Sequence, residues 1–447
     1  MNQDLTKGPI ARTLLLFVLP MTLGNMLQQL YNVADTLIVG RFLGPDALAA
    51  VGSAYTLMTF LTSIFLGLCM GSGAVFSIRY GARDEDSLKS SIFVSFVLIA
   101  VLTCLINAAV FLLIDPIMAF LKVPEAVYAM MRNYLWVIFT GLFATFLYNY
   151  FSSLLRALGN SVVPLIFLAV SAVTNIVLDL VFVVVFGWGV EGAAGATVFS
   201  QYLSGVGLGL YTLVRFPGLH PEKRHRKFSR DILREISQFS VLTCVQQSVM
   251  NFGILMVQGL VNSFGTAVMA AFAAAVKIDS FAYMPVQDFG NAFSTFVAQN
   301  YGAGKKDRIR KGIHVAAAVA VGFSLFVSAL VFLFARPLMT IFVDGSEHEI
   351  ISIGAGYLRV EGSFYCGIGI LFLLYGFYRA VKKPGMSVVL TVISLGTRVA
   401  LAYLLSAVPA LGVYGIWWSV PIGWFLADAA GLIYYRLKKD QLMNLLA

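Results

Sequence analysis

An aspartate at position 35 lies in a stretch of sequence that is otherwise almost wholly apolar. Gln28 and Asn32 precede it at helical spacing, so the three polar side chains form one stripe along a helix. An ionisable group within such a stretch is costly to bury and is therefore a candidate for function. Tyr31 flanks the stripe. Pro20, about four turns earlier, permits a kink because proline removes a backbone hydrogen bond.

A second aspartate has a similar setting. Asn175 and Asp179 are one helical turn apart in another apolar stretch, and Thr197 and Gln201 have the same spacing in the next one. Their carboxylate, amide and hydroxyl oxygens are hard ligands, which suit H⁺ or Na⁺ and not zinc. The alternative is that these groups only hydrogen-bond to one another and hold helices together. Two carboxylates are harder to explain in that way, because helix contacts do not require a charge that must be neutralised.

The elements that must position these residues are transmembrane helices. Hydrophobic residues make up 59% of the 447-residue chain and charged residues only 12%, against about 45–50% and about 25% in soluble domains. This composition excludes a soluble enzyme, a disordered chain and a nucleic-acid-binding domain. The four cysteines stand alone in apolar runs, so they indicate neither a metal site nor a disulfide framework.

The chain divides into twelve apolar stretches at its charged and Gly/Pro-rich links. A spanning helix needs about 20 mainly apolar residues, and a β-barrel would need short alternating segments instead. We therefore predict an all-α protein of twelve transmembrane helices. The spans lie near 11–39, 47–76, 90–114, 131–156, 163–186, 191–215, 235–262, 267–298, 313–335, 352–379, 385–408 and 413–436.

The basic residues predict the orientation of these helices. Of the 31 lysines and arginines, 24 lie in loops on the side of the N-terminus and 4 in loops on the other side. By the positive-inside rule, both termini are cytoplasmic. The net charge of +9 therefore reflects topology and does not indicate nucleic acid. The longest charged link runs from Arg215 to Arg234, near the middle of the chain, and could lie on anionic lipid or be a solvated loop.

The two halves of the sequence resemble each other at a nearly fixed offset. Tyr80-Gly81-Ala82 recurs as Tyr301-Gly302-Ala303, 221 positions later, and Gly189-Val190 recurs as Gly412-Val413, 223 positions later. Halves of even span number that both start inside have the same topology, related by a pseudo-twofold axis along the membrane normal. That is a plan of secondary transporters. The predicted domains are an N-lobe at 1–217, a cytoplasmic linker at 218–234 and a C-lobe at 235–447.

The repeat does not copy the polar site. The offset carries Asp35 to Met256 and Asp179 to Ala402. An architectural cluster could have persisted in both halves, so we infer that the first half binds the coupling ion.

The second half has charges of its own. Lys277 and Asp288 are eleven residues apart, too far to pair on one straight helix. Arg398 could meet Asp288, Asp428 or Glu361 from another helix. A structural ion pair and a cavity-lining role are both open for these groups.

Several motifs, taken in order, resemble the multidrug and toxin extrusion (MATE) family, in its DinF-like prokaryotic branch. The resemblance implies a V-shaped pair of six-helix lobes around a cavity, and a cation site in the N-lobe at Asp35, Asn175, Asp179 and Thr197, which could also hold Na⁺. We expect Gln28, Tyr31, Asn32, Gln201, Asn251 and Asp288 to line the cavity or contact substrate, and Pro20 to kink the first helix. The motifs are Tyr31-Asn32-Val33-Ala34-Asp35-Thr36, Arg156-Ala157-Leu158-Gly159-Asn160, Asn175-xxx-Asp179 and Ala298-Gln299-Asn300-Tyr301-Gly302-Ala303.

The expected function is therefore a secondary active multidrug efflux antiporter, which exports organic cations in exchange for inward H⁺ or Na⁺. We expect no enzyme activity, no cofactor and no nucleic-acid partner, and a monomer in the prokaryotic inner membrane. Another branch of the family uses a glutamate on the seventh helix, within which this sequence instead has Gln246, Gln247, Asn251 and Gln258, while Lys277 and Arg398 are unusual in a cavity for cations. A flippase for lipid-linked oligosaccharide is the alternative function.

The expected mechanism rests on two neighbouring carboxyl groups, Asp35 and Asp179, that share protons as a coupled pair. Protonation or Na⁺ binding removes their repulsion and draws the first helix toward the fifth, with Pro20 supplying the flexibility.

Overall fold

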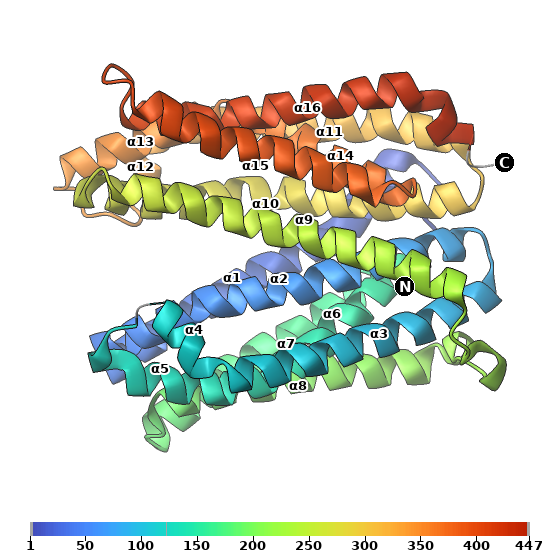
Figure 1. Cartoon of the computed structure of the whole chain (residues 1–447), viewed down its shortest axis with the longest axis horizontal. Helices are drawn as coiled ribbons and strands as arrows, with labels where there is room; N and C mark the ends of the chain where they lie inside the picture. The colour runs from blue at the N-terminus through green and yellow to red at the C-terminus, as the bar shows by residue number, and fades with distance from the viewer. Residues whose placement is uncertain (1–2, 122, 445–447) are drawn as a thin grey trace. The chain divides into compact units, whose positions relative to one another are not determined.

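The computed structural model describes residues 3–121 and 123–444, and their regular secondary structure is helical (Figure 1). Contacts divide the chain into two compact units. Unit 1 comprises Met1–Asp4 and Leu19–Cys244, and unit 2 comprises Leu5–Val18 and Val245–Ala447. The division falls inside two helices, α1 (Ile10–Leu43) and α9 (Arg230–Asn262).

The two units have the same order of helices. In each, three long helices precede a short one, α4 in unit 1 and α12 in unit 2, and a pair broken near its middle follows. In unit 2 that pair, α13 and α14, is bent by 51°. Unit 1 contains α2 (Pro45–Gly81), α3 (Glu85–Leu112), α4 (Ile114–Phe120), α5 (Glu125–Ile138), α6 (Leu142–Ala157), α7 (Val162–Asp179) and α8 (Gly189–Arg215). Unit 2 contains α10 (Thr266–Gly302), α11 (Lys306–Leu333), α12 (Ala335–Met339), α13 (His348–Gly362), α14 (Tyr365–Ala380), α15 (Pro384–Ser406) and α16 (Val413–Asn444).

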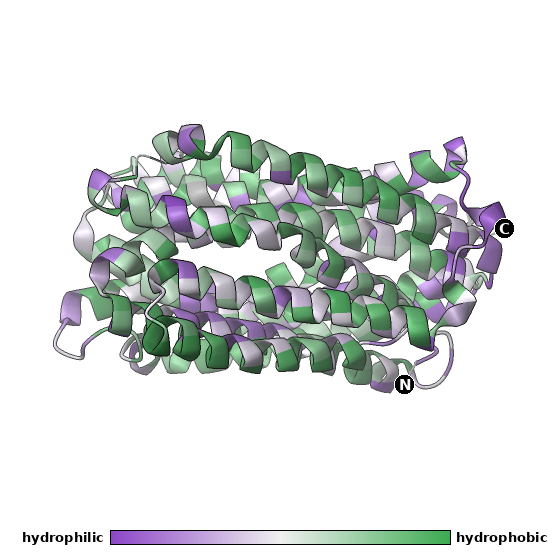
Figure 2. Cartoon of the chain, turned by 90° about the horizontal axis from the view of Figure 1, so that it is seen from below, coloured by the Kyte–Doolittle hydropathy of each residue, from purple (hydrophilic) through white to green (hydrophobic). Residues whose placement is uncertain are grey.

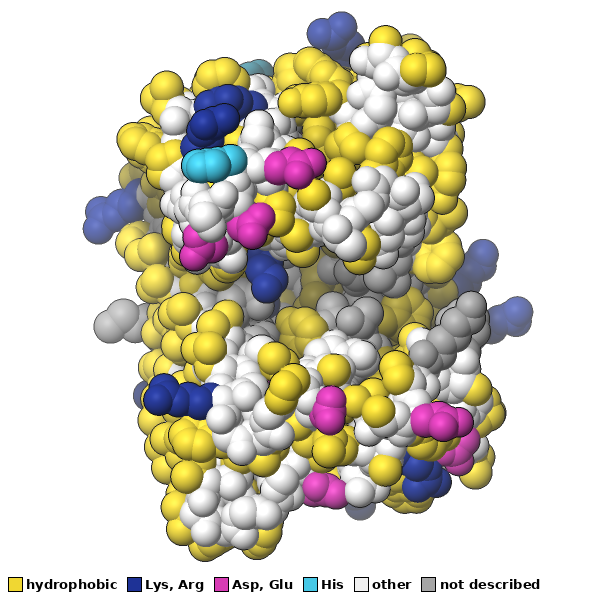
Figure 3. Space-filling model, turned by 90° about the vertical axis from the view of Figure 1, so that its left-hand side faces the viewer, with side chains coloured by type: hydrophobic (Ala, Val, Ile, Leu, Met, Phe, Trp, Pro, Cys, Tyr) yellow, Lys and Arg dark blue, Asp and Glu magenta, His cyan; other side chains and the backbone are white. Residues whose placement is uncertain are grey.

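The helices confirm the predicted all-α membrane architecture. Among the described residues, ten helices or joined helices are long and apolar enough to cross a membrane, and the bent pair α13–α14 makes up to eleven. The remaining predicted span, 191–215, is helix α8, which has 27 residues. Leucine, valine and phenylalanine side chains are exposed along many of these helices. Figure 2 shows hydrophobic colour along the middle of the helices, and on the face seen in Figure 3 charged side chains are scattered among hydrophobic ones.

The turns between helices repeat as well. Left-handed backbone, which favours glycine, recurs at the predicted offsets of 221 and 223 residues. Two of these positions hold other residues, Arg83 with φ 56° and Lys382 with φ 60°, whose partners in the repeat are glycines. The repeat therefore preserves backbone geometry more faithfully than side chains. The four pairs are Gly44 and Gly265, Arg83 and Gly304, Gly159 and Lys382, and Gly189 and Gly412.

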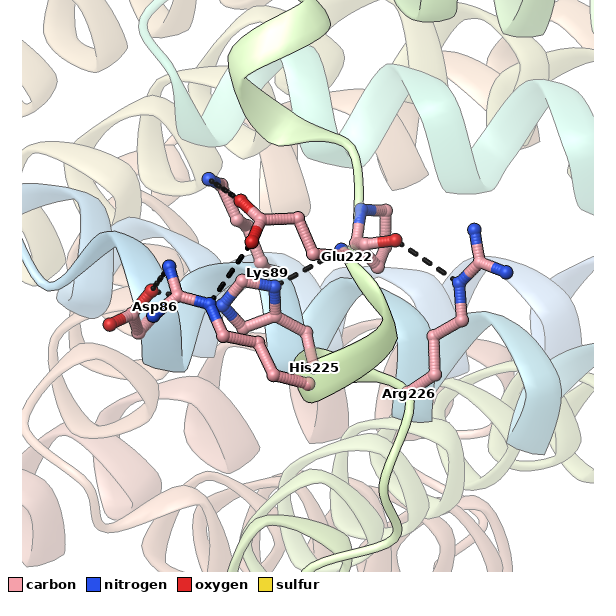
Figure 4. Close-up of polar contacts among 7 residues, drawn as sticks. Asp86, Lys89, Glu222, His225 and Arg226 are labelled. Atoms are coloured by element: carbon pink, nitrogen blue, oxygen red, sulfur yellow. Dashed lines mark hydrogen bonds and ion pairs between the residues drawn. The ribbon is translucent and has the colours of Figure 1, made fainter.

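The predicted linker is held by the start of α3. The His225 ring is buried, with Nε2 2.9 Å from Oδ1 of Asp86, while its Nδ1 accepts the backbone N–H of Glu222 at 3.1 Å. Because Nδ1 accepts, Nε2 carries the proton and donates to Asp86. Lys89 forms an ion pair with Glu222 at 3.6 Å, and Arg224 reaches Asp86 at 3.0 Å (Figure 4). These contacts attach the linker to unit 1.

In unit 2, the start of α11 holds the N-terminal segment in a comparable way. The Arg308 guanidinium donates to the backbone carbonyls of Leu5, Lys7 and Gly8. The side chains of the Gln299-Asn300 motif hold the backbone N–H and carbonyl of Leu5, which is fully buried. That motif therefore has a structural role at the end of α10.

The predicted domain boundaries at 217 and 235 differ from the contact grouping in two places. Residues 5–18 group with unit 2, although they lie within the predicted N-lobe, and residues 218–244 group with unit 1. The first difference follows from the hydrogen bonds that Arg308 donates to the backbone of residues 5–8. The second follows from the contacts between the linker and the start of α3.

Candidate functional site

Asp35 and Asp179 meet within unit 1, as predicted. Asp35 lies on α1 and is half-buried, while Asp179 is the last residue of α7 and is fully buried. The two carboxyl groups are neighbours that interact electrostatically. Two ionised carboxylates side by side repel each other, because each carries a negative charge. A shared proton or a bound cation between their oxygens would remove that repulsion.

Asn175 and Thr197 complete the predicted group of four. The amide of Asn175 donates to the Thr197 hydroxyl at 3.3 Å, and that hydroxyl donates to the backbone carbonyl of Ala193 at 3.1 Å. The carbonyl oxygen of Asn175 consequently faces the site as an acceptor. In the described part of the chain, four buried oxygens here have no hydrogen-bond donor: Oδ1 of Asp35, both carboxyl oxygens of Asp179, and Oδ1 of Asn175.

The local backbone brings these groups together. Directly after Asp179 the α-helix widens into a π-helical turn, Leu180–Val185, a feature that occurs frequently at functional sites. On α1, Gly24 lies against α7, where a Cβ would make ordinary van der Waals contact, 3.5 Å from the side chain of Leu168. Pro20 lies one turn earlier within an unbroken α1, beside the point where the helix passes from unit 2 to unit 1.

Two tyrosines border the carboxyl pair. Tyr31, predicted from the sequence, interacts with the side chain of Gln28 and lies within electrostatic range of Asp35. Tyr134 on α5 was not predicted, although it is buried within electrostatic range of both aspartates. A single tyrosine in an apolar helix carries no spacing signal, so the sequence offered no means of finding it.

The other predicted lining residues are more dispersed. Asn32 on α1 donates to the Tyr55 hydroxyl at 3.5 Å, and Gln201 on α8 lies against Gly141, where a Cβ would come within 2.5 Å of its Oε1. Asn251 and Asp288 lie in unit 2, on α9 and α10. Their role in lining a cavity stays a prediction.

Unit 2 contains a second carboxyl pair that the sequence reasoning missed in part. Asp279 on α10 and Glu361 on α13 are 5% and 1% exposed, and the Tyr357 hydroxyl lies within 3.4 Å of Oδ2 of Asp279 as well as close to Glu361. Tyr365 donates to Asp279 at 2.7 Å, and Tyr357 donates to Glu361 at 2.8 Å. The signal for Asp279 was present, since it is an aspartate inside a predicted span, two residues after Lys277.

Arg398 lies near Glu361, one of the three partners predicted for it, and also near Asp279. It interacts electrostatically with both carboxyl groups. Lys277 does not join them, because its side chain is exposed with Nζ 5.9 Å from the centre of the Phe342 ring. Asp428 on α16 is buried, and neither of its carboxyl oxygens has a hydrogen-bond partner among the described residues.

The donor atoms in unit 1 fit a proton or Na⁺ better than a transition metal. The described residues contain no group of three or more His, Cys, Asp or Glu side chains able to hold a metal ion. The unit 1 site instead combines two carboxyl groups with amide and hydroxyl oxygens, which are hard ligands. Either ion would be transported cargo at such a site and not a resident cofactor.

The chain is similar to a known protein family and to several of its members. The family model described as MatE matches residues 20–181 and 241–404. The chain is 30% identical over 443 residues to the "Probable multidrug resistance protein YpnP" of Bacillus subtilis (strain 168), covering 99% of this chain and 98% of that one. It is 25% identical over 442 residues to the "FAD transporter" of Shewanella oneidensis, covering 94% and 93% of the two chains.

Solved structures have the same fold. A crystal structure described as MATE in the bent conformation superposes on the whole of both chains with a TM-score of 0.93 at 23% sequence identity. The matched family segments, 20–181 and 241–404, fall one in each half of the sequence.

Proposed function

The chain belongs to the MatE family, and on that premise we propose that it is a secondary active transporter that exports organic compounds in exchange for an inward-moving H⁺ or Na⁺. Membership of this transporter family also means that the protein is not an enzyme. A relative with 30% identity over nearly the whole chain is named a probable multidrug resistance protein, which supports drug-like organic compounds as the substrates.

One observation carries the proposal. In unit 1, Asp35 and Asp179 interact electrostatically, and four buried oxygens at their site have no hydrogen-bond donor among the described residues. Neither aspartate forms an ion pair with a basic side chain in the described parts of the chain. Such a site is stable only when it holds a cation, so its occupancy follows the H⁺ or Na⁺ gradient.

The proposed cycle uses the flexibility of α1. When a cation leaves, the two carboxylates repel each other and favour separation of α1 from α7. When a cation enters from outside, the repulsion ends and the helices close together. Pro20 lies where α1 passes between the two units, so closure at Asp35 can move the first part of α1 within the membrane.

The experiment is transport by the purified protein in liposomes. An imposed inward H⁺ or Na⁺ gradient should drive export of a fluorescent organic cation, and Asp35→Asn or Asp179→Asn should abolish it. Thr174→Val is the matched control, because Thr174 is on the same helix but its hydroxyl bonds only to the backbone of Val170. Full gradient-driven export by both aspartate variants would show that this is not the coupling site.

The same liposomes test the finer parts of the proposal. Separate H⁺ and Na⁺ gradients identify the coupling ion, since the oxygen ligands fit both. A cationic dye and FAD serve as alternative cargoes, because one relative is named an FAD transporter and Arg398 lies near the unit 2 carboxyl pair. We propose cationic cargo, and transport of FAD alone would contradict that. Translocation of a lipid-linked oligosaccharide without drug export would support the flippase alternative.

The proposal extends to the setting of the protein. We propose a monomer of the DinF-like branch in the prokaryotic plasma membrane, with both termini in the cytoplasm, on the basis of the 24 basic residues on one side and 4 on the other. Labelling of single cysteines placed at the exposed residues 227 and 344, in a variant without the native cysteines, with a membrane-impermeant reagent in intact cells tests the orientation. Only the cysteine at 344 should react.

A further inference from the structure

The carboxyl pair of unit 2 is enclosed by ionisable side chains from four helices. Asp279 comes from α10 and Glu361 from α13, and Tyr365 on α14 holds Asp279 through its hydroxyl. Arg398, on α15, interacts electrostatically with both carboxyl groups at a range longer than an ion pair. Tyr283 and Tyr357, on α10 and α13, are the remaining titratable side chains that interact with the pair.

The two carboxyl groups can hold one proton between them. The Tyr357 hydroxyl lies within hydrogen-bonding distance of both, 2.8 Å from Oε2 of Glu361 and 3.4 Å from Oδ2 of Asp279. Two ionised carboxylates this close would repel each other, so a proton on one of them removes the repulsion. Glu361 is 1% exposed, and its Oε1 has no hydrogen-bond partner among the described residues. One shared proton leaves a single negative charge, which the guanidinium of Arg398 balances. Loss of that proton would leave two carboxylates against one guanidinium in a site closed to water.

The position of the pair links its protonation to the shape of the helix. Glu361 is the residue before the end of α13 at Gly362, and α14 begins at Tyr365 after a bend of 51°. Glu361 and Tyr365 therefore lie on opposite sides of the break. A change of the bend would separate the Tyr365 hydroxyl from Asp279 and admit water to the pair.

We propose that Asp279 and Glu361 form a second exchangeable proton site, balanced by Arg398 and opened by bending at the α13–α14 break. When the site opens, the O–H bond of the protonated carboxyl breaks and the proton passes to water. When it closes again, one proton is taken up. The transporter would then move one more proton per cycle than the unit 1 site alone carries, and this count rests on the proposed exchange function.

The charge of Arg398 makes this site selective for a proton. A guanidinium next to the carboxyl pair repels Na⁺ and organic cations, and it supplies the positive charge that such ions would otherwise provide. A proton differs because it is bonded covalently to one oxygen and requires no further ligands. Na⁺ is therefore expected to compete at the unit 1 pair and not at this one.

Infrared difference spectroscopy of the purified protein in nanodiscs tests the site without transport. A step to higher pH should remove a carboxylic-acid C=O band that is absent from Glu361→Gln and present in Asp35→Asn. Arg398→Gln should keep the band to higher pH, because removing the positive charge favours the neutral carboxyl group. Ser363→Ala is the matched control, since Ser363 lies at the same break and bonds only to the carbonyl of Arg359.

Three results would overturn the proposal. The first is a Glu361 band that persists at every pH at which the protein stays folded, which would make the shared proton a fixed structural element. The second is loss of that band on adding Na⁺ at constant pH. The third is an unchanged number of protons exchanged per drug molecule in Glu361→Gln liposomes. Failure of the proposed transport function would appear separately, as absence of drug export from the wild-type protein, and leaves the infrared test intact.

Discussion

The two carboxyl pairs differ in what balances their charge. In unit 1, Asp35 and Asp179 face amide, hydroxyl and tyrosine groups, and neither has a basic partner in the described residues. In unit 2, Asp279 and Glu361 face Arg398 as well as tyrosines. The first pair must take its positive charge from solution, whereas the second carries one within the protein.

This difference shows how the two halves of a repeated fold can take on different tasks. A site without an internal cation responds to ion concentration, because its occupancy decides whether the helices repel or attract. A site with an internal cation is already near neutrality when it holds one proton, so it responds mainly to conformation. We therefore expect unit 1 to set which gradient is used, and unit 2 to add to the number of protons moved.

The largest expected effect separates the pairs by transport. Asp179→Asn should reduce gradient-driven export to the level of protein-free liposomes, because the coupling charge is lost. Glu361→Gln should keep export but with one proton fewer. Each charge is worth about 2.3 kcal/mol per 100 mV, so the greatest drug gradient should fall about 50-fold at that potential. The measurement is the steady-state drug ratio at a set potassium diffusion potential. Equal losses in the two variants would contradict the division of tasks.

The fold could be predicted from the sequence because long apolar stretches identify membrane-spanning helices with little ambiguity. Stretches of about 20 apolar residues have few alternatives to a spanning helix. The repeat was visible in motifs such as Tyr80-Gly81-Ala82 because they mark helix ends, where the left-handed residues Arg83 and Gly304 recur. The exchange of the N-terminal segment between units was not predictable. It depends on the contacts of Arg308 with backbone carbonyls, which have no sequence pattern.

The part of the site that could be predicted is the part marked by the spacing of polar residues along single helices. Asp35, Asn175, Asp179 and Thr197 were proposed together from polar spacing and a family resemblance, and the structure brings them together. Tyr134 was missed because its role depends on the packing of α5 against other helices. Contacts between helices also form the unit 2 pair, but Asp279 itself could have been found, because it is an aspartate inside a predicted span.

The second prediction is that neutralising the two pairs has different effects on the stability of the protein. Neutralising unit 1 with Asp35→Asn and Asp179→Asn removes a repulsion and should leave the melting temperature unchanged or raised. Neutralising unit 2 with Asp279→Asn and Glu361→Gln leaves Arg398 without its partners. Because Arg398 is half-buried and interacts with the pair at a range longer than an ion pair, we expect a loss smaller than the about 3–5 kcal/mol that breaking a buried ion pair costs.

Thermal unfolding in nanodiscs followed by tryptophan fluorescence measures this difference. Adding Arg398→Met to the neutralised unit 2 pair should restore much of the lost stability, since no charge is then left without a partner. A lower melting temperature after neutralisation of unit 1, or no change after neutralisation of unit 2, would mean that the charge balance differs from the one described.

A third prediction compares how α3 and α11 hold the segments next to them. Arg308 donates to three backbone carbonyls of residues 5–8, and hydrogen bonds from a charged group contribute about 1.5–3 kcal/mol each. Arg308→Ala should therefore expose the N-terminal segment and increase its amide hydrogen exchange on the order of tenfold or more. Arg310→Ala, two residues later, is the control. Unchanged exchange in residues 5–8 would show that Gln299 and Asn300 alone are sufficient.

The smallest expected effect is at the linker on α3, where the contacts are more exposed. The hydrogen bond from His225, together with the nearby Arg224, lowers the pKa of Asp86, and Arg224 lowers the pKa of Glu222. A carboxyl group with a lowered pKa stabilises the docked linker above its usual titration range. That contribution is lost as the pH falls through the lowered value, below about 4 for aspartate.

Asp86→Asn imitates this loss at neutral pH. Trypsin should cut the linker at Lys227 and Arg230 a few times faster than in the wild-type protein, because His225 and Arg224 lose the carboxylate that they hold. Glu85→Gln, at the neighbouring exposed position, should leave the rate unchanged. If both variants are cut at the wild-type rate, the buried His225 ring holds the linker by packing alone. The resemblance between the anchors on α3 and α11 would then be one of position and not of chemistry.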